Sequence, residues 1–219
     1  MTGIYEHTKV AKRSNVGFGV KIMCSEWGSL VTERAIGLLR SFNSIKGQTP
    51  IQLKKYLRWC PPPNEYLKLN IDGAMFCDLK KVGIGMILSN ENGEVLMAAS
   101  KVENEGDNPE IIELLAVFQG MQMRVGRFVM NLIVESYYLL LVDSLNKNDM
   151  LDFELGALYG EVMRRKTCFA SCSFTHVFRE GNLVAHSLAR YTWNVENIEI
   201  WEDCIPNFLS QALWPDKCL

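Results

Sequence analysis

The 219-residue sequence predicts an α/β protein with a mixed five-stranded sheet flanked by helices. Two observations support this fold class. Three segments that alternate apolar and polar residues follow one another through short turns, as in an antiparallel meander. Two further strand-like segments come later in the chain and are separated by segments with helical spacing. Together these patterns give a mixed sheet with helices packed on it.

The meander occupies the first part of this domain. Residues 67–74 alternate apolar and polar side chains up to an Asp-Gly pair that marks the end of the first strand. Residues 82–89 give a second strand and residues 94–101 a third. The Asn-Glu-Asn-Gly segment at 90–93 between them is typical of a tight turn.

The second half of the chain supplies four helices and two strands. Ile112, Leu115 and Ala116 follow helical spacing, and Pro109 is tolerated because it stands in a first turn. In chain order, the predicted segments are a helix over 109–125, a strand over 129–136, helices over 138–146 and 153–165, a strand over 169–178 and a helix over 183–191.

A run of three prolines, Pro61 to Pro63, marks the domain boundary. Three consecutive prolines fit neither a helix nor a central strand, so the run predicts a stiff extended connector. We therefore expect four regions. They are a basic N-terminal extension, partly helical or flexible, over 1–56, a Pro-rich connector over 57–66, the α/β domain over 67–195 and a C-terminal tail over 196–219.

Composition argues against a membrane or secreted protein. The densest apolar run, residues 137–142, is far shorter than the roughly 20 residues of a membrane span. The N-terminus lacks the layout of a secretory signal. The seven cysteines are scattered, with no C-x-x-C pair, so a disulfide framework is not expected. We expect a soluble intracellular protein, nuclear or cytoplasmic, without a membrane partner.

Charge is divided unevenly along the chain. Residues 1–66 contain ten Lys and Arg against four Asp and Glu, whereas residues 67–219 contain thirteen against twenty-one. The basic part suggests either an anionic partner for the extension or attraction between the extension and the acidic domain. The sequence leaves both possibilities open, and it shows no basic and aromatic patch typical of a single-strand platform.

Acidic residues are predicted to meet at one edge of the sheet. Asp72 ends the first strand, and Glu113 lies in the first helix after the meander. Clustered carboxylates are the hard oxygen ligands that a pair of Mg²⁺ ions requires for phosphodiester hydrolysis.

Several ordered motifs resemble the plant ribonuclease H-like domains linked to non-LTR retroelement reverse transcriptases. The resemblance covers about residues 57–210 and is specific because the motifs occur in the right order and spacing. The motifs are Leu-Asn-Ile-Asp-Gly-Ala at 69–74, the strand at 82–88, Asn-Gly-Glu-Val-Leu at 92–96, Ile-Glu-Leu-Leu-Ala at 112–116, Ile-Val-Glu-Ser at 133–136 and the segment 176–190. The Trp-Cys-Pro-Pro-Pro segment at 59–63 and the Trp-Glu-Asp-Cys-Ile-Pro segment at 201–206 also look like this family.

This resemblance implies hydrolysis of the RNA strand of an RNA–DNA hybrid by four carboxylates that hold two Mg²⁺ or Mn²⁺ ions. Asp72 and Glu113 match the first two acids. The third position, after the Glu-Ser pair at 135–136, is Tyr137, and the fourth, four residues after Asn182, is His186. Two carboxylates supply half the charge of four, so we expect weak or absent cleavage. Glu135 shares a strand face with Tyr137 but lies about 6.6 Å back along the strand, which makes it a poor substitute.

The resemblance also implies roles outside the acids. His176 matches a loop histidine associated with proton movement or product release, although a partly exposed histidine without a role fits equally well. Asn182 is also suited to cap the last helix. Candidate nucleic-acid contacts are Gly73, Lys80, Lys81, Arg179 and Asn182.

Three functions therefore remain open from the sequence. The chain is a ribonuclease H-type hydrolase, a catalytically depleted relative that binds RNA–DNA hybrid or RNA without cutting it, or a retroelement relict that persists as an interaction module. A monomer is expected in each case. We expect a nucleic-acid-binding domain of the ribonuclease H type with impaired catalysis.

Overall fold

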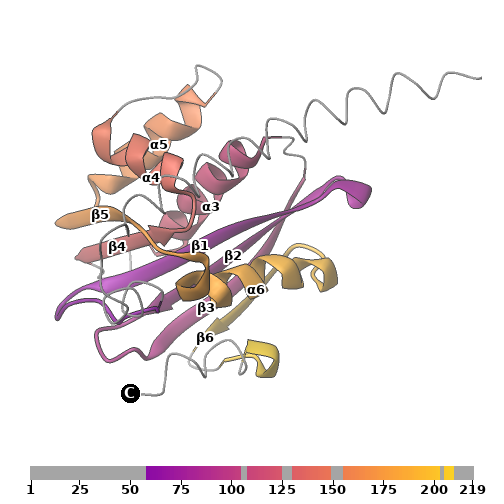
Figure 1. Ribbon diagram of the computed structural model, residues 1–219, viewed down its shortest axis with the longest axis horizontal. Helices are drawn as coiled ribbons and strands as arrows, with labels where there is room; N and C mark the ends of the chain where they lie inside the picture. Colours follow the sequence, from indigo (N-terminus) through magenta and orange to yellow (C-terminus); the bar gives the residue numbers. More distant parts are fainter. Residues whose placement is uncertain (1–57, 105–107, 125–129, 149–154, 203–204, 210–219) are drawn as a thin grey trace, which may run out of the picture. The chain divides into compact units, whose positions relative to one another are not determined.

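The computed structural model describes residues 58–104, 108–124, 130–148, 155–202 and 205–209 (Figure 1). The predicted N-terminal extension over 1–56 lies outside these residues. Within the described residues, no helix is long and apolar enough to cross a bilayer.

A six-stranded mixed sheet forms the centre of the domain, with strand order β5-β4-β1-β2-β3-β6. β1 pairs antiparallel with β2 and parallel with β4, which in turn pairs parallel with β5. β3 pairs antiparallel with β2 and with β6. The strands are β1 (Leu67–Phe76), β2 (Lys81–Ser89), β3 (Val95–Asn104), β4 (Asn131–Ser136), β5 (Ser171–His176) and β6 (Ile198–Glu202).

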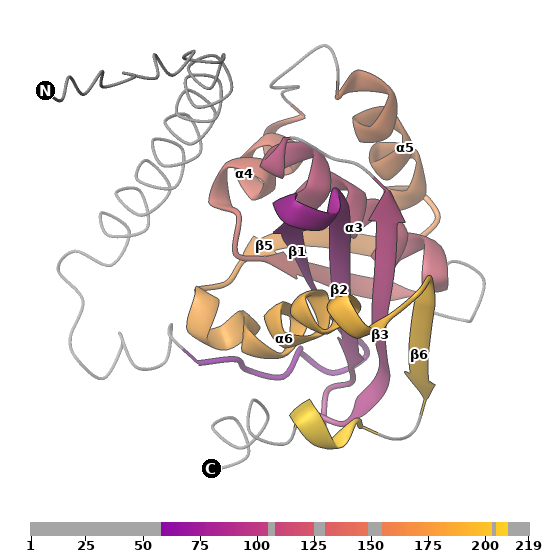
Figure 2. The same ribbon diagram turned by 90° about the vertical axis from the view of Figure 1, so that its right-hand side faces the viewer.

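Helices cover both faces of the sheet (Figure 2). One face packs against three helices in the larger hydrophobic core, and the other packs against α6 in a smaller one. The helices are α3 (Pro109–Arg124), α4 (Leu139–Lys147), α5 (Gly156–Lys166) and α6 (Leu183–Tyr191). Short 3-10 turns stand at η1 (Cys77–Leu79), η2 (Arg179–Asn182), η3 (Thr192–Asn194) and η4 (Asn207–Leu209).

Successive side chains of β1 point alternately to the two faces of the sheet, and so to the two hydrophobic cores. Leu69 and Ile71 are fully buried in the larger core. Lys68, Asn70 and Asp72 point to the opposite face, since successive side chains of a strand alternate. These three polar residues are also buried. The polar face of β1 is therefore an interior surface rather than a solvent-exposed one.

Two glycines let α6 lie directly on the β2 backbone. A Cβ at Gly83 would overlap Thr192 Oγ1 and the Ala189 carbonyl, and one at Gly85 would overlap the backbone of α6 at Ala185 and Ala189. Only glycine permits so close an approach. These contacts determine where α6 and the following η3 turn rest on the sheet.

The predicted mixed sheet flanked by helices is confirmed, and the structure adds a sixth strand. β6 lies within the segment expected to be a C-terminal tail, and it pairs with the edge of β3. Its five residues, Ile-Glu-Ile-Trp-Glu, are short, and Ile198 and Ile200 are exposed. A strand this short at a sheet edge leaves a weak sequence signal, which is why the pattern alone does not indicate it.

Candidate functional site

The site begins where α3 meets the second half of β1. A Cβ at Gly73 would overlap the Ile112 side chain, so glycine lets the first turn of α3 approach the strand next to Asp72. Glu113, one residue further along α3, accepts a hydrogen bond from Ser136 Oγ at the end of β4, at 3.4 Å. Because β1 and β4 are parallel, their carboxyl ends face the same edge of the sheet. The fold thus places Asp72 and Glu113 towards this edge of the sheet.

Both acids are buried. Asp72 is 1% exposed and Glu113 is 3% exposed. A buried carboxylate requires a polar or charged partner, because loss of hydration is otherwise very costly.

Asp72 is hydrogen-bonded to His186, the residue that the resemblance places at a fourth acid position. His186 Nδ1 lies 2.8 Å from Asp72 Oδ2, and His186 Nε2 lies 3.2 Å from Nη2 of Arg179. A guanidinium only donates hydrogen bonds, so His186 Nε2 accepts and His186 Nδ1–H donates to the carboxylate. The result is a carboxylate–imidazole–guanidinium chain that runs from the buried Asp72 to the exposed Arg179.

Tyr137 and His176 meet through the backbone. His176 Nε2 lies 3.1 Å from the Tyr137 carbonyl oxygen and therefore carries the hydrogen of this bond. The His176 ring also packs edge-on against Phe178. Burial lowers the pKa of His176 below its usual value, while the bond to Tyr137 and the charge of Asp143 oppose this shift. His176 is thus a partly buried ring held at the end of β5.

Glu135 is committed to a different set of contacts. Lys68 Nζ forms an ion pair with Glu135 Oε1 at 2.7 Å, and Asn70 Nδ2 donates to Glu135 Oε2 at 2.9 Å. Lys68 Nζ also donates to the Cys60 carbonyl at 2.7 Å. With both carboxylate oxygens engaged by Lys68 and Asn70, Glu135 is a structural charge.

Asn182 holds the α6 layer on β1. It stands at the N-cap position of α6, but its side chain makes no capping hydrogen bond. Its amide nitrogen instead donates to the Ile71 carbonyl at 2.8 Å, and its oxygen accepts from Asn70 at 3.2 Å. The predicted capping role is therefore replaced by a bond to the sheet, and Asn182 itself is 2% exposed.

The predicted basic contacts are separated in space. Arg179 is exposed in η2 and faces His186, as described above. Lys80 and Lys81 are exposed after η1, at the far end of β1. Gly73 is half-buried, and the Ile112 contact already accounts for it.

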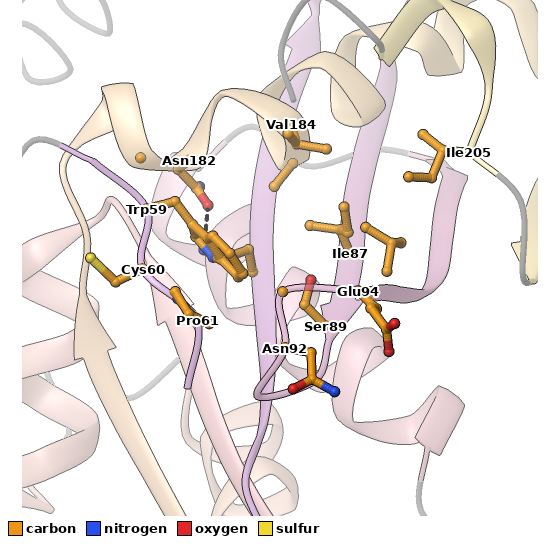
Figure 3. Close-up of a pocket in the computed structure, with 15 residues that line it drawn as sticks. Trp59, Cys60, Pro61, Ile87, Ser89, Asn92, Glu94, Asn182, Val184 and Ile205 are labelled. Carbon is orange, nitrogen blue, oxygen red and sulfur yellow. Dashed lines mark hydrogen bonds between the residues drawn. The ribbon is translucent and has the colours of Figure 1, made fainter. Parts of the chain in front are cut away.

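Sequence reasoning missed the role of Trp59. Its indole Nε1 donates to Asn70 Oδ1 at 2.8 Å, and Lys68 Nζ lies 5.5 Å from its ring centroid. Trp59 also lines a pocket of about 620 Å³, together with Ile87, Val184 and Ile205, beside the start of α6 (Figure 3). The one available signal is the Trp-Cys-Pro-Pro-Pro segment, whose prolines indicate only a connector.

The donor set does not suit a pair of Mg²⁺ ions. Among the described residues, no group of three or more His, Cys, Asp or Glu side chains is arranged to hold a metal ion. An imidazole nitrogen is a poor ligand for Mg²⁺, which prefers oxygen. The exposed end of the chain from Asp72 is moreover a guanidinium, which repels a cation.

A comparison with protein families matches residues 70–192, more than half of the chain, to the family described as "Reverse transcriptase-like". The chain belongs to this reverse transcriptase-like family. No curated protein matches the chain. The matched region runs from Asn70 on β1 to Thr192, directly after α6, and so contains Asp72, Glu113 and His186.

Solved structures show which fold the reverse transcriptase-like domain shares. RNase H1 from the archaeon Halobacterium salinarum is 18% identical, with a TM-score of 0.54, and the match covers 59% of this chain and 98% of the archaeal one. The N-terminal RNase H domain of a Mycobacterium tuberculosis protein is 17% identical, with a TM-score of 0.54 and coverage of 59% and 94%. LC11-RNase H1, solved in complex with RNA/DNA hybrid, is 19% identical, with a TM-score of 0.50 and coverage of 57% and 94%. The predicted ribonuclease H-like fold is confirmed.

Proposed function

We propose that this domain binds RNA–DNA hybrid or RNA in the manner of ribonuclease H-type domains and cleaves it weakly or not at all. The chain Asp72–His186–Arg179 is the observation that carries this proposal. At its exposed end, the Arg179 guanidinium places a positive charge of the protein where the ribonuclease H reaction requires metal ions. The hybrid complex of LC11-RNase H1, which shares the fold, supports nucleic acid as the ligand class.

Electrostatics support impaired cleavage. Two Mg²⁺ ions bring a charge of +4, and Asp72 and Glu113 supply −2 in total. His186 and Tyr137 add no carboxylate, and Glu135 is neutralised by Lys68. Loss of supporting groups around a metal site alone costs about 10–100-fold in affinity or activity, and loss of ligands costs more. By the resemblance, Asp72 and Glu113 match two of the family's metal-binding carboxylates, and His176 matches the histidine associated with proton movement.

The same proposal includes the type of retroelement from which the domain derives. The ordered motifs from Asp72-Gly73 to the segment 176–190 favour a domain derived from a plant non-LTR retroelement. Exposed Arg179, Lys80 and Lys81 are then contacts to phosphates. Such contacts make binding depend on salt concentration.

Cleavage and binding of a labelled RNA–DNA hybrid test the proposal separately. Binding of the hybrid, and of the labelled RNA strand alone, is measured by fluorescence anisotropy in EDTA. Cleavage of the hybrid is measured with Mg²⁺ and with Mn²⁺. The variants are Asp72→Asn, the double variant Tyr137→Asp with His186→Asp, and a triple variant that adds Arg179→Gln. The matched control is Ser187→Asp, which adds an acid next to His186 where the serine bonds only to its own helix.

We expect the wild-type protein to bind the hybrid and to cleave it weakly or at a rate below detection. The triple variant is expected to cleave at least about tenfold faster than the wild type, since it restores the acids and removes the competing cation. Ser187→Asp should cleave no faster than the wild type. Wild-type cleavage that Asp72→Asn abolishes would show that two acids suffice. It would overturn the proposal that cleavage is impaired. Absence of hybrid and RNA binding would overturn the assigned ligand.

A further inference from the structure

An aromatic and basic surface lies at the tip of the β1–β2 hairpin, beyond the candidate site. We call Phe76, Lys80, Lys81 and Trp193 the tip patch. Trp193 is 60% exposed and packs edge-on against Phe76, with ring centroids 5.7 Å apart. Phe76 is the register partner of Lys81 across the β1–β2 ladder. The hairpin tip and the C-terminal end of α6 lie at the same end of the sheet (Figure 1).

Trp193 is held firmly despite its exposure. It belongs to η3, whose first residue, Thr192, is buried and donates to the Ala189 carbonyl at 2.6 Å. Gly83 receives Thr192 directly on the β2 backbone. Val195, which follows the turn, is buried as well. The indole is therefore presented on a rigid base, so that a ligand stacking on it loses little conformational entropy of the protein.

The charges of the tip patch favour an anionic ligand. Lys80 and Lys81 are both exposed, and among the described residues of the hairpin turn the only acid is the exposed Asp78. Lys80 has a left-handed backbone, with φ of 48°. The side chains of Lys80 and Lys81 therefore do not alternate between the two faces of the sheet as they would in a regular strand. An exposed aromatic ring beside ammonium groups is the arrangement that binds single-stranded nucleic acid, by stacking with bases and by pairing with phosphates.

We propose that the tip patch binds a single-stranded nucleic-acid segment, with a base stacked on Trp193 and neighbouring phosphates paired with Lys80 and Lys81. This proposal rests on the proposed function. It adds to the bound hybrid a single-stranded segment of the same nucleic acid. Phe76 and Asp72 lie on the same face of β1, four residues and therefore about 13 Å apart. A strand that leaves a hybrid bound near Asp72 reaches the tip patch within a few nucleotides.

Three ligands test the tip patch. They are a blunt RNA–DNA hybrid, the same hybrid with a ten-nucleotide single-stranded DNA overhang, and that single strand alone. Anisotropy titrations in EDTA compare the wild type with Trp193→Ala, Trp193→Phe and the double variant Lys80→Gln with Lys81→Gln. Met130→Ala is the matched control, because Met130 is 63% exposed and lies directly before β4, away from the hairpin tip. Circular dichroism verifies that each variant is folded.

We expect the wild type to bind the overhang hybrid at least about fivefold more tightly than the blunt one, the equivalent of one stacked base. Trp193→Ala should remove this advantage, Trp193→Phe should retain part of it, and blunt binding should not change. The double lysine variant should reduce the salt dependence of single-strand binding by about 0.7 for each lysine–phosphate pair that it removes. Met130→Ala should behave as the wild type.

The outcomes separate this inference from the proposed function. Equal binding of overhang hybrid by the wild type and by Trp193→Ala overturns the tip patch, and blunt-hybrid binding then still supports the proposed function. Single-strand binding that depends on Trp193 without any blunt-hybrid binding supports the tip patch and contradicts the hybrid ligand. Failure to bind all three ligands contradicts both.

Discussion

Two polar clusters lie on the same face of β1. They differ in whether their last charged group is buried or reaches the surface. The closed cluster consists of Lys68, Asn70 and Glu135, with Trp59 and Asn182 bonded to Asn70. The open cluster consists of Asp72, His186 and Arg179. In the closed cluster each charge meets a buried partner. The open cluster runs from a buried carboxylate to a guanidinium at the surface.

We expect this difference to separate a structural role of the closed cluster from a ligand-related role of the open one. The closed cluster ties four segments together, namely the chain around Trp59, β1, β4 and the turn before α6. Removal of one charge there leaves its partner buried and unpaired, which is strongly destabilising. The open cluster tolerates change at its exposed end, since solvent can replace a missing partner. Ligand contacts are therefore expected at the open cluster, and stability is expected to depend on the closed one.

Glu135→Ala should have the largest effect on stability. It leaves the Lys68 ammonium, 8% exposed, without its carboxylate, and we expect a loss of about 3–5 kcal/mol in the free energy of unfolding. Asp72→Asn should cost much less, because an asparagine oxygen still accepts the hydrogen of His186 Nδ1. Urea unfolding measures both. Equal losses in the two variants would contradict the division into a closed and an open cluster.

Arg179→Gln should alter binding and leave stability nearly unchanged. We expect a shift in unfolding free energy within about 0.5 kcal/mol, as for other surface substitutions. Removal of one arginine–phosphate pair should reduce the slope of log affinity against log salt for blunt hybrid by about 0.9. Arg164→Gln is the control, since Arg164 is exposed on α5 and pairs with Glu161. An unchanged salt slope for Arg179→Gln would remove Arg179 from the binding surface.

The smallest expected effect concerns pH and His176. Burial lowers the pKa of His176 below its usual value of 6.5, so the folded state favours the neutral ring. The resulting stability is fully present above pH 6.5 and is lost as the pH falls through the lowered pKa, because the unfolded state then binds the proton more readily. Urea unfolding between pH 7.5 and pH 5 should show a smaller loss for His176→Gln than for the wild type. A parallel decline in both proteins would show that His176 does not contribute.

Periodicity predicted most of the fold because the strands and helices of this domain carry their own hydrophobic patterns. The segments predicted for β1 to β5 and α3 to α6 all form the expected type of element, with ends shifted by a few residues. β6 was missed because its register depends on β3 rather than on a pattern of its own. The positions of Asp72 and Glu113 were predictable because each stands in a recognisable motif. Asn182 stands at the N-cap position of α6 as expected, but the sequence could not show that its side chain bonds to Ile71, 111 positions away, instead of capping the helix.

The sequence by itself determined the order of the elements and the places of Asp72, Glu113, Tyr137 and His186 within motifs that resemble the ribonuclease H type. These are local properties, set by side-chain period and by spacing within motifs. Only the tertiary structure decided that the polar side of β1 is buried, that Glu135 is neutralised by Lys68, that His186 joins Asp72 to Arg179, and that Trp193 stands beside Phe76 near Lys81. Each of these contacts joins residues that meet only after the sheet has formed and α6 and the hairpin have packed. Sequence spacing therefore cannot predict them.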